Sequence, residues 1–261
     1  MFMNVNHMAS QITNLSFALA EEGRQHNSHL QSRFNREWEQ IDVSHIPCID
    51  KVPEQHRLFL QAVAESLSWL QDSVDNRELA RKFLEEYFRI LVWCTIAERT
   101  LLDVRQRIED RFPTPPKVEG KGQTKNLIPK RLTAIIAGLE SWAQVSLPAV
   151  HEGQQLDLEE IQRRAIYVNK GVRWSSLAAV KMYAIQNDGD TNNKKIVLSR
   201  SIYPPMGRAV SRGIERLFGF SLGESKGDHE IAKDLHLKLA ELTGESVFDL
   251  NSGFYKIGGG L

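Results

Sequence analysis

Apolar residues recur at helical spacing through most of the first half of the chain. Over residues 54–111, leucine, phenylalanine and valine return every three or four positions, with charged residues between them. This period predicts two or three amphipathic helices. Residues 12–22 and 30–40 show a similar spacing and are expected to form two earlier helices. Residues 41–53, which contain two prolines, are expected to connect them to the rest.

A proline cluster ends this helical half. Residues 113–116 read Pro-Thr-Pro-Pro. Proline lacks an amide hydrogen and disfavours helix in the residue before it. Residues 117–126 follow with two glycines, three lysines and a single large apolar residue, which is typical of a flexible linker. We therefore predict a helical domain over residues 1–112 and a linker over residues 113–127.

After the linker, the pattern predicts a short helix over residues 129–145 and then two helices followed by a β-hairpin. A short helix and a second helix over residues 172–185 are separated by Asn-Lys-Gly. Residues 183–186 and 195–199 are predicted as strands around residues 187–193, a turn rich in Asn, Asp and Gly. Helix, turn, helix and hairpin is the order of a winged helix. We assign residues 128–223 to a winged-helix-like domain.

The last part of the chain predicts a final helix and a tail over residues 224–261. Apolar residues recur at helical spacing over residues 228–242, and Gly244 follows as a stop signal. The predicted fold class is therefore mainly α, with an N-terminal helical domain and a C-terminal winged-helix-like domain that has a small β-hairpin.

Charge changes this picture, because it is unevenly distributed in a chain whose formal net charge is zero. Residues 161–216 contain eleven basic and three acidic residues, a net charge of +8, whereas residues 1–116 carry −4 and residues 217–261 carry −3. A basic segment between acidic flanks is typical of a surface that holds a polyanion. We therefore expect nucleic-acid binding.

The candidate contacts fall into three groups along this segment. The contacts expected on the recognition helix are Lys170, Arg173, Ser175, Ser176 and Lys181. Those expected on the hairpin are Lys194 and Lys195. Those expected to bind the phosphate backbone are Arg200, Arg208, Arg212 and Arg216. The last three arginines recur every four residues, so they lie along one stripe of a helix. The predicted function is that of a non-catalytic DNA-binding protein, a regulator or the DNA-holding subunit of a larger complex, with double-stranded DNA as the expected partner.

Two alternatives remain open. In the first, the protein is an adaptor whose basic patch docks an acidic protein. In the second, Arg24 and His29, which have an Arg-x4-His spacing used by certain helical ribonucleases, form a catalytic pair. Residues 54–111 are expected to contact a protein partner or a second copy of the chain.

Other classes find little support. The eight histidines are scattered and no paired cysteines accompany them, so no metal site is expected. No glycine-rich nucleotide motif occurs, and we expect no cofactor and no enzymatic activity. Two distant cysteines and a start without a signal-peptide pattern favour the cytoplasm. No apolar run is long enough to span a membrane, so no membrane partner is expected.

Overall fold

The computed structural model describes residues 5–38, 44–51, 74–97, 103, 106–107, 110–111, 162–163, 177–178, 180–185 and 202–260. These residues are mainly helical, and no β-strand occurs among them. The prediction of a mainly α protein is confirmed. The chain divides into two compact units, one made of Met1–Asn35 with Ala184–Leu261 and the other of Arg36–Tyr183.

The second unit contains α3 (Val74–Ile96), which lies within the region where the sequence predicts helices. Its buried residues recur at helical spacing and are Phe83, Leu84, Tyr87, Phe88 and Val92. The short helix η1 (Ile49–Lys51) contacts α3, and Ile46 and Ile49 are buried. At the edge of this contact His45 Nε2 lies 3.2 Å from Glu85 Oε1, which also accepts a hydrogen bond from Arg89.

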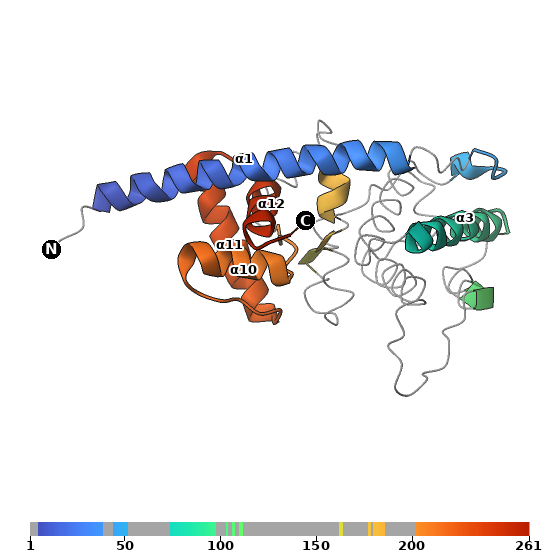
Figure 1. Cartoon of the computed structure of the whole chain (residues 1–261). Helices are drawn as coiled ribbons and strands as arrows, with labels where there is room; N and C mark the ends of the chain where they lie inside the picture. Colours follow the sequence, from blue (N-terminus) through green and yellow to red (C-terminus); the bar gives the residue numbers. More distant parts are fainter. Residues whose placement is uncertain are drawn as a thin grey trace. The chain divides into compact units, whose positions relative to one another are not determined.

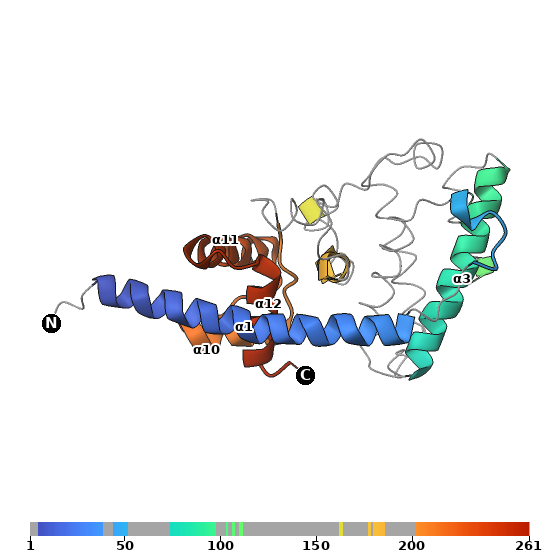
Figure 2. The same cartoon turned by 90° about the horizontal axis from the view of Figure 1, so that it is seen from above.

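The first unit begins with α1 (Val5–Trp38), a single helix of 34 residues. The sequence predicted two helices over residues 12–22 and 30–40, and the structure corrects this, because residues 23–29 are helical as well. Figures 1 and 2 show α1 as one rod that crosses α12. Gly23, the residue that weakens the helical pattern, lies at this crossing and is buried.

Three C-terminal helices complete the first unit: α10 (Arg208–Phe218), α11 (Lys226–Thr243) and α12 (Val247–Ile257). Residues at their boundaries explain where they start and stop. Ser225 caps α11 through a reciprocal capping box with Asp228. Gly219 and Gly244 end α10 and α11 in the left-handed conformation, with φ of 75° and 73°. The predicted helix over residues 228–242 and its stop at Gly244 are confirmed.

Helix α12 lies at the centre of this unit. Seven of its eleven residues are buried, from Val247 to Phe254. The hydrophobic core around it takes residues from every helix of the unit and consists of Leu19, Ala20, Met206, Val210, Ile214, Leu222, Ala232, Leu239, Leu250 and Phe254. His236 is fully buried beside Phe254, and its Nδ1–H donates to the Ala232 carbonyl oxygen at 2.7 Å. The His236 imidazole is therefore hydrogen-bonded within the core.

Glycines set how closely α12 approaches its neighbours. A Cβ on Gly253 would lie 2.8 Å from the Leu19 carbonyl carbon of α1, and one on Gly213 of α10 would lie 2.8 Å from the Phe254 carbonyl carbon. Carbon atoms in ordinary contact stand about 3.5–4.0 Å apart. Helices α1 and α10 therefore each touch the backbone of α12 at positions where no side chain fits.

The predicted division of the chain places a helical domain at residues 1–112 and a final helix and tail at residues 224–261. The linker over residues 113–127 lies outside the described residues. The domain division, including residues 128–223 as a winged-helix-like domain, stays a prediction.

One detail of the predicted hairpin is corrected. Tyr183, Ala184 and Ile185 are helical, so no strand begins at Tyr183. Residues 177–178 and 180–184 are all buried, and hydrophobic period alone does not distinguish a short buried helix from a buried strand. The second predicted strand, residues 195–199, lies outside the described residues.

Candidate nucleic-acid interface

Helix α10 carries three of the predicted contacts and has a clear local origin. Pro204 and Pro205 precede it and keep the chain extended until Gly207, the N-cap. At the other end the Gly219 N–H donates to the Glu215 carbonyl oxygen at 2.8 Å and closes the last turn. One face is buried through Val210, Gly213 and Ile214. The opposite face is exposed and charged.

The exposed face bears Arg208, Arg212 and Arg216, as the four-residue spacing predicts. Glu215 is exposed on the same face, so the formal charge there is three positive and one negative. Within the described part of the chain, Arg208 and Arg212 make no ion pair. Their guanidinium groups therefore have no structural partner among these residues.

Arg216 differs from the other two arginines. It donates a hydrogen bond from Nη1 to the Ile257 carbonyl oxygen at the end of α12. It also lies in the last turn of α10, where a positive charge is favourable to the helix dipole. Arg208 is the first residue of α10, where the same dipole disfavours a cation. Arg216 thus contributes to the fold, whereas the position of Arg208 is not explained by helix stability.

A loop that is anchored to α10 by a hydrogen bond borders this charged face. Residues 219–225 connect α10 to α11, and the Ser211 hydroxyl donates to the Leu222 carbonyl oxygen. Leu222 is buried in the core, whereas Phe220 is 39% exposed. The Phe220 ring lies 6.3 Å from the ring of Phe218, centroid to centroid. The loop therefore holds an exposed aromatic ring at the side of α10.

The other predicted contacts separate into one described residue and seven that are not. Lys181 is buried, with 8% exposure, which weighs against a phosphate contact. The residues that lie outside the described part of the chain are Lys170, Arg173, Ser175, Ser176, Lys194, Lys195 and Arg200. Among the members of the predicted set that the structure describes, Arg208, Arg212 and Arg216 lie together on α10.

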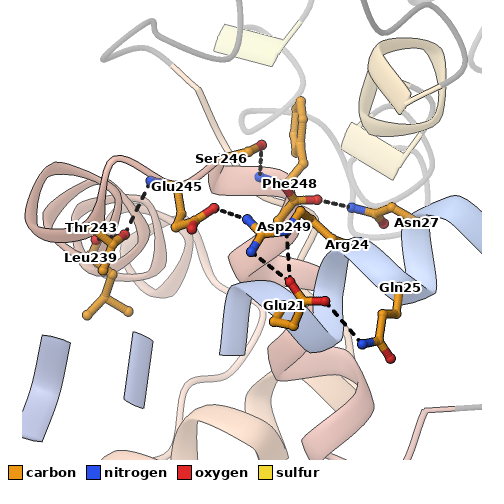
Figure 3. A network of polar contacts seen from close by, with 10 residues as sticks. All are labelled: Glu21, Arg24, Gln25, Asn27, Leu239, Thr243, Glu245, Ser246, Phe248 and Asp249. Atoms are coloured by element: carbon orange, nitrogen blue, oxygen red, sulfur yellow. Dashed lines mark hydrogen bonds and ion pairs between the residues drawn. The ribbon is translucent and has the colours of Figure 1, made fainter. Parts of the chain in front are cut away.

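Arg24 of the ribonuclease alternative belongs to a structural network. Figure 3 shows its guanidinium between Glu21 and Glu245. Hydrogen bonds with Glu21 raise the pKa of Arg24 above its ordinary value, with a further contribution from Glu245. Asn27, one turn further along α1, donates to Asp249 Oδ1 at 2.7 Å. These contacts tie α1 to the start of α12, and His29 is exposed outside them.

A second polar cluster joins the segment before α10 to α11. The Tyr203 hydroxyl donates to Glu230 Oε1 at 2.9 Å, and Lys233 Nζ lies 2.9 Å from Glu230 Oε2. Burial, together with the Glu230 carboxylate, raises the pKa of the Tyr203 phenol. A raised pKa keeps the phenol protonated, so it is a hydrogen-bond donor and not a base. This cluster links Tyr203 to α11 and stabilises the fold.

Sites of other kinds are not found in the described residues. No group of three or more His, Cys, Asp or Glu side chains among them could hold a metal ion. No helix within the described ranges has the length and apolarity needed to cross a membrane.

Sequence reasoning missed Phe218 and Phe220. They flank Gly219, and a glycine directly after a charged amphipathic helix is a recognisable C-cap signal. That signal predicts the turn. It does not predict which of the two rings is exposed, because that depends on the contact of Phe218 with the core residue Phe254.

No protein-family model, curated protein or solved structure matches this chain.

Proposed function

We propose that this protein binds DNA without catalysis, as a regulator or as the DNA-holding subunit of a larger complex. The observation that carries the proposal is the exposed face of α10, where Arg208 and Arg212 lie one turn apart and make no ion pair within the described residues. Arginine donors form charge-assisted, often bidentate hydrogen bonds to phosphate. A polyanion is the partner that such a face fits.

The rest of the proposal extends this face along the basic segment. Lys170, Arg173, Ser175 and Ser176 would read base edges from the second helix of a winged helix, while Lys194, Lys195 and Arg200 would contact phosphates from the hairpin and beyond it. This part rests on the sequence pattern alone. Double-stranded DNA is the partner it favours, because such a helix enters the major groove.

The proposed partner surface and the proposed cellular location also rest on the sequence alone. Residues 54–111, with their amphipathic pattern, are the proposed contact for a protein partner or a second copy. Distant cysteines favour the cytoplasm.

Fluorescence anisotropy with a labelled random-sequence 20-base-pair DNA tests the proposal. Affinity should fall steeply between 50 and 200 mM salt, because each neutralised phosphate releases counterions. Reversing the charge at Arg208→Glu with Arg212→Glu should abolish or strongly weaken binding and lower the salt slope by about two, roughly one per lost phosphate contact. Arg216 is left intact, since it holds α12.

A matched control reverses two exposed lysines of α11, Lys226→Glu with Lys238→Glu. The net charge then changes by the same amount while α10 is untouched. Binding lost equally in both variants would point to the overall charge and would contradict a site on α10. Absence of binding to DNA or RNA at 50 mM salt would contradict the proposed function and favour an acidic protein as the partner of the basic patch.

A further inference from the structure

The loop after α10 carries an exposed aromatic ring and is anchored to the helix that bears the proposed phosphate contacts. Ser211, which anchors the loop through Leu222, follows Arg208 by three residues and precedes Glu215 by four. Side chains at these spacings are neighbours on a helix surface. The loop that carries Phe220 therefore borders the face that carries the two arginines.

Aromatic contacts link the Phe220 ring to the hydrophobic core. Phe254 is fully buried in the core, the Phe218 ring lies 6.1 Å from it, and the Phe220 ring lies 6.3 Å from that of Phe218. Gly219 turns the chain with φ of 75°, a conformation that other residues rarely adopt. The exposed ring is thus held by tilted aromatic contacts that lead to the core and by a loop with a buried anchor. It is preorganised and loses little entropy on binding.

We infer that the nucleic acid bound at α10 is single-stranded and that one of its bases stacks on Phe220. This inference rests on the proposed function, and it replaces a duplex by a single strand at this site. The bases of a duplex are stacked on each other, so their faces are closed to a side chain at the surface. An unpaired base exposes its face, and arginines that hold the backbone beside an aromatic ring are the combination that single-strand-binding proteins use.

The test compares three 20-nucleotide probes by anisotropy: oligothymidine, the same backbone with abasic sites, and a duplex. The wild-type protein should bind oligothymidine about 5- to 150-fold more tightly than the abasic strand, the range expected for one stacked base. Phe220→Leu should remove this difference and leave abasic binding unchanged. Phe220→Trp should retain it.

The control is Leu242→Ala, which alters an apolar side chain that is 57% exposed on α11 and should change neither affinity. Urea unfolding of each variant checks that the unit is folded. Equal binding of oligothymidine and the abasic strand, or equal loss of both in Phe220→Leu, would overturn the stacking inference while DNA binding stands. Duplex binding tighter than single-strand binding and unaffected by Phe220→Leu would overturn it too. Failure to bind any probe would refute the proposed function itself.

Discussion

Adding one methyl group at Gly253 should destabilise the unit formed by α1 and the C-terminal helices. In an ordinary helix the change from glycine to alanine stabilises by about 1 kcal/mol, because alanine has the higher helix propensity. Gly253 lies inside α12 and is fully enclosed at the crossing with α1. The sign of the effect therefore distinguishes the tertiary contact from local propensity.

The magnitude follows from the distances at this crossing. The new Cβ would lie 2.8 Å from both the carbonyl carbon and the Cδ1 atom of Leu19, and closer still to the Leu19 carbonyl oxygen. Contacts of about 3.5–4.0 Å require the two helix backbones to separate by roughly 1 Å, since a backbone carbonyl cannot rotate away. Overpacking of this kind costs up to about 3 kcal/mol. After the gain in propensity, we expect a net loss of about 2 kcal/mol.

Urea unfolding monitored by circular dichroism measures this loss. The matched control is Gly227→Ala, because a Cβ at this exposed position in the first turn of α11 meets only the Ser225 hydroxyl oxygen at 3.8 Å. That variant should be as stable as the wild type or slightly more so. A Gly253→Ala protein that unfolds at the wild-type urea concentration or above would refute the close crossing of α1 and α12.

A double variant sharpens the test. Gly23→Ala places a methyl group 2.6 Å from the Asp249 carbonyl carbon at the same crossing, from the α1 side. Both substitutions push the same two helices apart. The combined loss should therefore be smaller than the sum of the single losses by at least about 0.5 kcal/mol. Strict additivity would contradict a shared crossing.

Two further substitutions test the polar contacts of this unit. Ser225→Ala removes the N-cap of α11 and should cost about 1 kcal/mol in urea unfolding. Hydrogen bonds from the Ser225 hydroxyl and N–H also lower the pKa of Asp228, so the part of the capping contribution made by this carboxylate should be present above its unfolded pKa and be lost as the pH falls through the depressed native pKa. A wild-type-minus-variant difference that does not shrink in acid would contradict this. Ser252→Ala removes the buried donor to Asn27 Oδ1 at 2.5 Å and should cost about 1–3 kcal/mol, whereas an unchanged unfolding midpoint would show that this bond contributes nothing net.

Local sequence signals predicted the elements of the C-terminal helices well. The apolar spacing over residues 228–242 and Gly244 predicted α11 and its end, and the four-residue spacing of Arg208, Arg212 and Arg216 predicted that they share a helix face. These features depend on residues within one or two turns of each other. Such information is present in the sequence, because helix period, caps and stop signals are local.

Long-range contacts decided the rest. The gap between the two helices predicted over residues 12–22 and 30–40 is absent, because α1 continues through it and Gly23 lies at the crossing with α12, more than 220 residues away along the chain. The local sequence does not distinguish a glycine that ends a helix from a glycine that lets two helices touch. Propensity alone therefore favours the wrong structure at this position.

Composition and spacing by themselves determined that the protein is mainly helical, where its basic segment lies, and which arginines share a face. Only the tertiary structure decided that the two ends of the chain build one unit, that Arg216 is partly a structural residue and that Phe220 is exposed in a loop anchored to Ser211. The physical reason is that exposure and pairing depend on which distant helix covers a side chain. Charge and hydrophobic period are properties of neighbouring residues, whereas burial is a property of the packed molecule.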